Sequence, residues 1–254
     1  MKKRLDILLV ERGLAESRTQ AQALVLAGLV PGYEKPGHQV DESAELSIEA
    51  PPRYVSRGGE KLANALAQVE VELDGRDCLD LGASTGGFTD ALLQHGAGRV
   101  IAVDVGYGQL HPKLRGDPQV VVMERTNARD LTELPFEPDL LVCDVSFISV
   151  RLVLPPALRL LEDGWDALVL VKPQFEAGRA EVGKGGVVRD PETHRRILRS
   201  TIQAALAWEA MAIGVVDSGL PGPKGNREFF VHFIHRDEAV LLDDIDDRID
   251  AAVG

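Results

Sequence analysis

The chain has 254 residues, of which 44% are hydrophobic, 27% charged and 5% aromatic. These values are typical of a folded globular protein with one large domain, or with a mid-sized domain and a small module, and they exclude intrinsic disorder and collagen-like structure. The formal net charge of −12 argues against a protein that binds nucleic acid over its whole surface. Part of the acidity falls in a terminal segment between Asp237 and Asp250, whereas Lys2, Lys3 and Arg4 leave room for a local basic face.

No segment approaches the ~18 to 20 consecutive apolar residues that a membrane span needs. Asp6 follows the basic N-terminus at once, and Glu11 and Arg12 interrupt the first apolar stretch, so a secretory signal does not fit. We therefore expect a cytoplasmic protein with no membrane partner. Cys78 and Cys143 each lie in an apolar run that predicts a strand, which favours buried, reduced cysteines over a disulfide or a metal site.

Two short helices and a strand are predicted within the first fifty residues. Apolar residues repeat at helical spacing from Leu5 onward, and Gly13 can end that helix. Ser17, followed by Gln20 three positions later, forms a capping box that opens a second helix. The alternating residues 44–48 then predict a small strand.

Two adjacent prolines, Pro51 and Pro52, mark the end of this small module. We therefore expect residues 1–52 to form one domain, residues 53–60 an interdomain linker and residues 61–254 a second domain.

The second domain alternates apolar strands with longer helical stretches, which is typical of a mostly parallel sheet covered on both faces. One helix has Asp190 at its N-cap and Pro191 at its first position. Residues 217–228 are too few for a crossover helix, so the last two strands should form an antiparallel hairpin. This layout predicts an α/β fold, the seven-stranded Rossmann-like sheet of class I methyltransferases. The predicted strands are residues 78–81, 99–103, 120–123, 140–143, 167–171, 212–216 and 229–234.

A glycine-rich turn follows the first of these strands. Asp80 lies near the end of the strand, and Gly82 and Gly86 lie in the turn, so that backbone can approach a ligand closely. Asp104 follows the second strand and can accept hydrogen bonds from both ribose hydroxyls of a nucleoside cofactor. The spacing departs from the dinucleotide fingerprint, and Asp80 suits a cationic methionine amino group better than a pyrophosphate. S-adenosylmethionine is therefore favoured over NAD, while a turn that only reverses the chain is the alternative.

Four charged residues lie at the borders of apolar elements, namely Lys61, Asp144, Lys172 and Glu228. In a doubly wound sheet, functional groups gather at the carboxyl ends of the parallel strands, and an antiparallel last strand begins at that same edge. Each residue alone is typical of a surface charge, but together they predict a site at this edge. The six histidines show no ligand spacing, so no metal site is predicted.

Several segments carry a resemblance to a known family. Residues 4–18 look like an S4 RNA-binding module, and residues 56–62 resemble the entry to an FtsJ-like methyltransferase. With the motifs Asp80-Leu81-Gly82-Ala83-Ser84-Thr85-Gly86-Gly87-Phe88-Thr89, Cys143-Asp144-Val145-Ser146-Phe147-Ile148-Ser149 and Val171-Lys172-Pro173-Gln174-Phe175-Glu176, almost the whole chain resembles the TlyA family. That family bears the names of haemolysins and of ribosomal RNA 2′-O-methyltransferases. Between Leu29 and Lys35 the chain is shorter than the usual S4 hairpin.

The resemblance implies an S-adenosylmethionine-dependent enzyme that methylates a ribose 2′-hydroxyl of ribosomal RNA, with cytidine as the nucleoside. Its Lys-Asp-Lys-Glu catalytic set falls on Lys61, Asp144, Lys172 and Glu228. We assign the general base to Lys172, because a neutral amine can take the hydroxyl proton. Asp144 would orient that amine, and Lys61 and Glu228 would place the hydroxyl. The sulfonium already activates the methyl group, so the chemistry needs no metal.

Contacts with the two substrates follow from the same resemblance. Ribosomal RNA or a ribosomal subunit is the expected partner, with no obligate protein partner. The cofactor-binding residues would be Asp80 for the amino group, Gly82, Ser84, Gly86 and Phe88 around the methionine portion, Asp104 for the ribose and Asn127 for the adenine. A plain turn residue after a strand is the alternative interpretation of Asn127. The RNA-binding residues would be Arg4, Arg12, Arg18 and Gln22 in the small module, with Lys184 and Arg189 in the second domain.

Two other functions compete with this interpretation. The first is a membrane-damaging protein, which only the haemolysin name suggests. The second is an RNA-binding ribosome assembly factor that keeps the methyltransferase fold without its activity.

Overall fold

The computed structural model describes residues 2–178 and 181–254. The chain divides into two compact units, Met1–Arg53 and Tyr54–Gly254. The boundary lies close to the predicted end of the small module. Each unit has hydrophobic core clusters of its own.

The first unit is built from two helices and a two-stranded antiparallel sheet. Leu5, Leu9 and Val25 are almost fully buried in its core, which explains the helical spacing of the apolar residues. Its elements are β1 (Lys2–Arg4), α1 (Leu5–Glu11), α2 (Arg18–Leu26) and β2 (Gln39–Asp41).

The ends of both helices in this unit follow the predicted signals. Gly13 adopts a φ of 69° just beyond α1, a backbone conformation that favours glycine. Ser17 Oγ accepts a hydrogen bond from the amide of Gln20 at 3.2 Å, and Gln20 Oε1 accepts one from the amide of Glu16 at 2.6 Å. Ser17 is therefore the N-cap of α2, although the reciprocal bond reaches one residue further back than in a standard capping box.

The strand predicted over residues 44–48 is wrong. The strand that pairs with β1 is β2, in which Val40 lies opposite Lys3. Residues 44–48 have no regular secondary structure, yet Ala44 and Leu46 pack against the core of the unit. The alternation in the sequence therefore reflects alternate packing of a loop against the core and not strand pairing.

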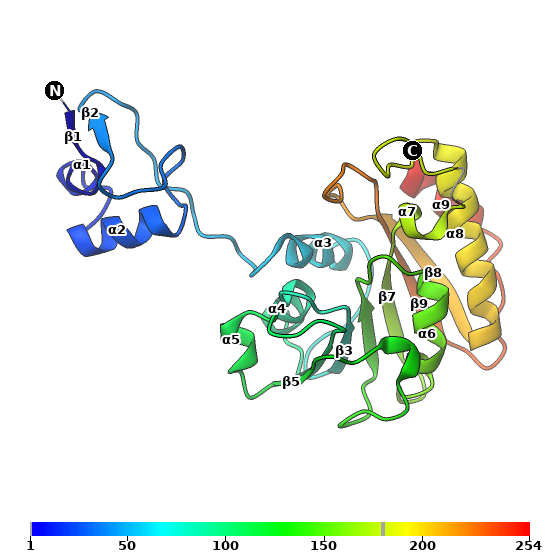
Figure 1. Ribbon diagram of the computed structural model, residues 1–254. Coiled ribbons are helices and arrows are strands. Elements are labelled where there is room, and N and C mark those ends of the chain that lie inside the picture. The colour runs from blue at the N-terminus through cyan, green and yellow to red at the C-terminus, as the bar shows by residue number, and fades with distance from the viewer. Residues whose placement is uncertain (1, 179–180) are drawn as a thin grey trace. The chain divides into compact units, whose positions relative to one another are not determined.

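The second unit contains a seven-stranded sheet with the order β5-β4-β3-β6-β7-β9-β8 (Figure 1). Strands β3 to β7 pair in parallel, and β9 pairs antiparallel with both β7 and β8. The seven predicted strands and the final antiparallel pair are confirmed. The strands are β3 (Asp77–Leu81), β4 (Arg99–Val103), β5 (Val120–Met123), β6 (Leu140–Cys143), β7 (Asp166–Val171), β8 (Ala210–Asp217) and β9 (Phe229–His235).

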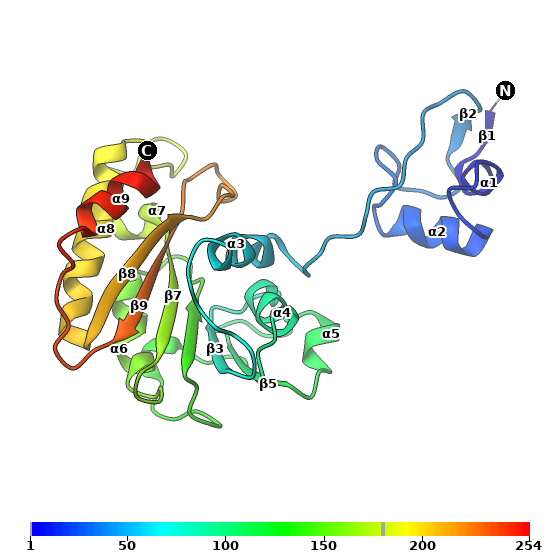
Figure 2. The ribbon, with the colours of Figure 1, turned by 180° about the vertical axis from the view of Figure 1, so that it is seen from behind.

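Helices cover both faces of this sheet (Figures 1 and 2). One face packs on α3 (Arg57–Leu66) and α4 (Gly87–Gln94), and the other on α6 (Val150–Leu158), α8 (Pro191–Ala205) and α9 (Ile245–Val253). Asp190 caps α8 as predicted, since its carboxylate accepts a hydrogen bond from the amide of Thr193 at 2.9 Å. The shorter elements are α5 (Pro112–Arg115), η1 (Ala128–Asp130), α7 (Pro173–Glu176) and η2 (Leu206–Trp208).

The segment predicted as a linker, residues 53–60, belongs largely to the second unit. Helix α3 begins within it, at Arg57, and Tyr54 is only 3% exposed. Gly59 explains this tight packing, because a Cβ at that position would lie 2.4 Å from the Tyr54 side chain and 2.9 Å from the carbonyl oxygen of Gly87. Gly59, within the segment predicted as a linker, therefore allows α3 to approach α4 closely.

Strand order and register determine which residues meet at the carboxyl edge of the sheet. The order reverses between β3 and β6, so the turns after these two strands lead away in opposite directions. Val171 of β7 pairs with Phe229 of β9, which places the next residues, Lys172 and Glu228, opposite each other at this edge.

We expect Gly59→Ala to destabilise the second unit by about 1 to 3 kcal/mol, because the added methyl group overlaps backbone and a buried tyrosine. The matched control is Gly58→Ala, in the same helical turn, where a Cβ meets nothing closer than 3.4 Å. Both tryptophans, Trp165 and Trp208, lie in this unit, so urea unfolding followed by tryptophan fluorescence measures its stability. Equal stability of the two variants would contradict the packing argument.

Candidate active site

Two lysine–carboxylate ion pairs lie at the carboxyl edge of the sheet. In the first pair, Lys172 Nζ lies 2.6 Å from Asp144 Oδ1, and in the second pair, Lys61 Nζ lies 2.5 Å from Glu228 Oε2. Both lysines and Glu228 are buried, and about a fifth of the Asp144 side chain is exposed. The structure therefore brings the four predicted charged residues together as two pairs.

Each member of the two pairs comes from a different element. Lys61 lies on α3, Asp144 follows β6, Lys172 follows β7 and Glu228 precedes β9. Gln174, two residues beyond Lys172, donates a hydrogen bond to Glu228 Oε1 at 3.1 Å and so connects the β7 turn to the second pair. Burial makes these contacts much stronger than the same pairs would be on an exposed surface.

Sequence reasoning missed two polar residues at this site. Ser146 Oγ accepts a hydrogen bond from Lys172 Nζ at 2.8 Å, and Gln174 contacts Glu228 as described. Both lie two residues after a predicted catalytic residue, within the motifs that carry the family resemblance. That spacing was the signal that could have identified them.

A cavity of about 890 Å³ is lined in part by Asp144, the carboxylate partner of Lys172. Its lining includes Ser84 and Asp104 from the β3 and β4 turns and Asn127 from the turn after β5. A smaller cavity of about 160 Å³ is lined by Lys172 and Phe88. The residues that line both cavities are Gly82, Ser84, Asp144 and Ser146. The large cavity is therefore continuous with the surroundings of Lys172.

The backbone of the glycine turn forms one wall of the large cavity. Gly82 has a φ of 86°, and a Cβ there would lie 2.7 Å from the carbonyl oxygen of Asp144, so only glycine allows the two turns to meet. Asp104 holds the turn in place, accepting hydrogen bonds from the amides of Ser84 at 2.8 Å and Gly106 at 2.6 Å. Each carboxylate oxygen keeps a second lone pair, so Asp104 can also accept from a ligand hydroxyl.

Three of the predicted cofactor-binding residues, Asp80, Gly86 and Phe88, do not line the large cavity. Asp80 is fully buried beneath the turn and lines neither cavity, as its Oδ2 accepts hydrogen bonds from the amide and hydroxyl of Thr89. Gly86, with a φ of 94°, caps α4 and packs against Leu114. Phe88 lines the smaller cavity and stacks on Phe230. Asp80 and Gly86 support the turn, and direct contact of either with a cofactor stays a prediction.

Negative charge is concentrated beneath and beside the glycine turn. Burial raises the pKa of Asp80 to about 7, and repulsion from Asp144 and Asp104 adds to this effect. Asp80 Oδ1 is buried and has no hydrogen-bond partner among the described residues. A ligand with positive charge, such as the sulfonium and ammonium groups of S-adenosylmethionine, would be stabilised by these carboxylates, so the residues present fit that cofactor.

The predicted RNA-binding residues of the first unit surround a buried carboxylate that the sequence analysis did not single out. Asp6 is fully buried and accepts hydrogen bonds from Arg4 Nη2, Arg18 Nε and Gln22 Nε2, each at 2.9 Å. These bonds, led by those of Arg4, hold the pKa of Asp6 well below its usual range. Arg12 lies apart and donates to the carbonyl oxygens of Glu42 and Ala44.

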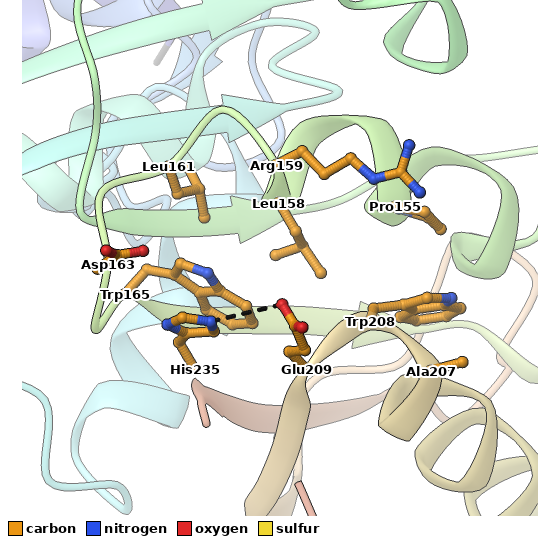
Figure 3. Close-up of a pocket in the computed structure, with 10 residues that line it drawn as sticks. All are labelled: Pro155, Leu158, Arg159, Leu161, Asp163, Trp165, Ala207, Trp208, Glu209 and His235. Atoms are coloured by element: carbon orange, nitrogen blue, oxygen red, sulfur yellow. Dashed lines mark ion pairs between the residues drawn. The ribbon is translucent and has the colours of Figure 1, made fainter. Parts of the chain in front are cut away.

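A further cavity, of about 360 Å³, lies at the opposite edge of the sheet (Figure 3). It is lined by Trp165 at the start of β7, His235 at the end of β9 and Trp208 before β8. The ring of His235 stacks on Trp165, with 5.5 Å between ring centroids. Because the catalytic-type residues follow β6 and β7 at the other edge, this cavity is not part of the candidate active site.

The fold and the carboxyl-edge site together define a class I methyltransferase. The FtsJ-like methyltransferase family matches residues 54–235, and the S4 domain family matches residues 3–30. No helix in the described part of the chain is long and apolar enough to cross a membrane.

Relatives of known name match nearly the whole chain. The 16S/23S rRNA (cytidine-2′-O)-methyltransferase TlyA of Mycobacterium tuberculosis (strain ATCC 25618 / H37Rv) is 45% identical over 98% of this chain and 97% of its own length. Hemolysin A of Brachyspira hyodysenteriae is 40% identical over 91% of this chain and 99% of its own. A solved structure from Streptococcus thermophilus, provisionally named a hemolysin, is 41% identical, with a TM-score of 0.77 over 99% of this chain and 95% of that chain. The chain belongs to the TlyA family of FtsJ-like methyltransferases with an S4 domain.

The raised pKa of Asp80 predicts a pH-dependent effect of Asp80→Asn on stability. Since an unfolded aspartate has a pKa near 3.8 and the folded one about 7, wild-type stability falls as pH rises from about 4 to about 7. The amide cannot ionise, so the variant should gain stability relative to wild type over this window, by at most about 4 kcal/mol. Urea unfolding at pH 4 and at pH 8 measures the change, and a difference that does not vary with pH would contradict it.

Proposed function

We propose that this protein transfers a methyl group from S-adenosylmethionine to a ribose 2′-hydroxyl of ribosomal RNA, at a cytidine. The observation that carries the proposal is the continuity between the large cavity and Lys172, since Gly82, Ser84, Asp144 and Ser146 line both. A donor in the large cavity can thus present its methyl group beside a positioned amine, which in-line transfer requires. The names of the TlyA relatives support the choice of substrate.

The cofactor would lie along the glycine turn. Gly82 and Ser84 would contact its methionine portion, Asp104 its ribose and Asn127 its adenine, with Phe88 closing the side toward Lys172. Asp80 and Gly86 would act through the turn that they support, with Asp80 also supplying negative charge. The bound sulfonium supplies an electrophilic methyl group, so this chain's residues need only orient the hydroxyl and receive its proton.

Lys172 is the proposed general base. Its Nζ is fixed by Asp144 at 2.6 Å and by Ser146 Oγ at 2.8 Å, which leaves one direction free for the substrate hydroxyl. In its neutral form Lys172 can donate hydrogen bonds to Asp144 and Ser146 and direct its lone pair toward the substrate hydroxyl, whose proton it accepts as the oxygen attacks the methyl group.

The second pair would position the hydroxyl. Glu228 neutralises Lys61 and is itself held by Gln174, so this pair offers fixed hydrogen-bonding groups without excess charge. Such preorganised groups accelerate a reaction because they need no rearrangement as charge develops.

RNA binding is assigned to both units, with Met1–Arg53 as the S4-like domain and Tyr54–Gly254 as the methyltransferase domain. Arg4, Arg18 and Gln22 are held in place by Asp6, and the arginines remain half-exposed, with donors left for phosphate groups. Lys184 and Arg189 are exposed in the loop between α7 and α8, and Arg12 completes the proposed set.

The hemolysin names of some relatives suggest the competing function, membrane damage. Release of a dye from liposomes by the pure protein, at an undiminished level in Lys172→Ala, would favour it. The other competitor, an assembly factor without activity, predicts RNA binding with no methyl transfer. Incubation of ribosomal subunits with the protein and labelled S-adenosylmethionine, followed by mapping of 2′-O-methyl groups, separates all three functions.

Lys172→Arg should lose turnover by roughly 10² to 10⁴-fold, because guanidinium cannot give up its proton to act as a base. It keeps a positive charge beside Asp144, so binding of RNA and of S-adenosylmethionine should change little. Single-turnover methylation rates and calorimetric affinities test both expectations. A variant that retains more than about a tenth of the wild-type rate would show that Lys172 only positions the substrate.

Asp104→Ala should weaken S-adenosylmethionine binding at least tenfold, since it removes a ribose acceptor and the carboxylate that holds the turn. The matched control is Asp77→Ala, which removes a carboxylate from the start of β3, at the opposite edge of the sheet. Calorimetry gives both affinities. Normal affinity of Asp104→Ala would refute the placement of the cofactor ribose.

A further inference from the structure

A buried asparagine, Asn226, joins two loops beside the candidate active site. The residue is 3% exposed, and among the described residues its side chain forms hydrogen bonds with backbone of the α7–α8 loop. Asn226 Oδ1 accepts a hydrogen bond from the amide of Val188, and Asn226 Nδ2 donates one to the carbonyl oxygen of Gly186, each at 2.9 Å. Both polar atoms of the amide are thus used to hold one loop against the other.

The same residue closes the turn that packs against Glu228. The carbonyl oxygen of Asn226 accepts a hydrogen bond from the amide of Gly222 at 2.9 Å. Gly222 in turn packs on the catalytic-type carboxylate, since a Cβ there would lie 2.4 Å from Glu228 Oε1. Asn226 lies two residues before Glu228, so its position limits where that carboxylate can point.

The α3 helix is attached to the same turn. Arg57 Nη2 donates a hydrogen bond to the carbonyl oxygen of Pro221 at 2.5 Å, and Lys61 follows Arg57 by one helical turn. The turn therefore contacts Glu228 directly and is linked to Lys61 through the hydrogen bond to α3.

The loop that Asn226 holds is cationic and rich in glycine. It contains Lys184 and Arg189, both exposed, and Gly185 and Gly186 with φ above 80°. Lys224, from the other loop, reaches over it, with Nζ 3.6 Å from the position of a Cβ on Gly186. Exposed cations on two joined loops suit the phosphate backbone of an RNA strand.

We propose that Asn226 is a positioning residue that locks the cationic loop to the turn carrying Glu228, so that the RNA strand and the Lys61–Glu228 pair are held in one fixed arrangement. This inference rests on the proposed methylation of RNA. Irregular loops lack the regular backbone hydrogen bonds of helices and strands, and the Asn226 side chain supplies two hydrogen bonds to backbone in their place. Buried hydrogen bonds of this kind fix a single arrangement of the loops.

The test compares Asn226→Ala with wild type in single-turnover methylation of ribosomal subunits. We expect the rate at saturating RNA to fall at least tenfold and the half-saturating RNA concentration to rise several-fold, with S-adenosylmethionine affinity within twofold of wild type. The matched control is Gln119→Ala, which removes an amide that bonds to the carbonyl oxygens of Ala97 and Gly98 away from the site. It should leave both parameters unchanged.

A double-mutant cycle with Glu228→Ala separates positioning from general loss of structure. If Asn226 acts on the rate through Glu228, then Asn226→Ala should slow the Glu228→Ala enzyme by less than twofold. The inference would be overturned if the two substitutions lowered the rate additively, or if Asn226→Ala had the wild-type rate. It would also be overturned if Asn226→Ala changed only the dependence on RNA concentration. Wild-type protein that transfers no methyl group to any subunit would instead refute the proposed function.

Hydrogen exchange provides a readout that does not depend on activity. Exchange at the amide of Val188, which donates to Asn226, should rise at least tenfold in Asn226→Ala and stay unchanged in Gln119→Ala. Unchanged protection of Val188 in Asn226→Ala would also overturn the inference.

Discussion

The antiparallel position of β9 between β7 and β8 is the constraint on which the candidate site depends. In an all-parallel sheet, only residues that follow strands reach the carboxyl edge. Because β9 runs the other way, a residue that precedes it, Glu228, reaches that edge opposite Lys172. The second ion pair then needs only α3 to supply Lys61, and Gly59 allows α3 to pack closely enough to do so.

Charge balance explains why the site holds two ion pairs and not two free lysines. A buried lysine without a partner carries a large desolvation cost, whereas a paired lysine keeps its place at a smaller cost. Around the glycine turn the balance is reversed, since Asp80, Asp104 and Asp144 lie near one another, and burial together with repulsion from Asp144 and Asp104 raises the pKa of Asp80. At this edge of the sheet, charge is therefore balanced beside the two lysines and negative beneath the glycine turn. This arrangement suits a cationic methyl donor bound next to Lys172, the proposed base.

Much of the second unit could be predicted because its apolar strands are short, buried on both faces and separated by clear helix signals. The prediction was wrong where alternation had another cause, as in residues 44–48, and where Gly59 serves close packing within the segment predicted as a linker. The four charged residues were expected at one edge of the sheet, with Asp144 beside Lys172, but the Lys61–Glu228 ion pair and the contacts of Ser146 and Gln174 were not predicted. Asp6, Ser146, Gln174 and Asn226 act through contacts with residues distant in sequence, which only the folded chain reveals.

A buried side chain that organises more exposed ones occurs in both units of this chain. In the first unit Asp6 gathers Arg4, Arg18 and Gln22 on one carboxylate, and in the second Asn226 holds a loop with exposed cations. Flexible cations lose side-chain entropy when they bind phosphate, and prior fixing removes part of that cost. With a net charge of −12, the protein cannot rely on overall attraction to RNA. Under the proposed function, affinity for RNA would come from small sets of cations, of which Arg4 and Arg18 are already held by Asp6.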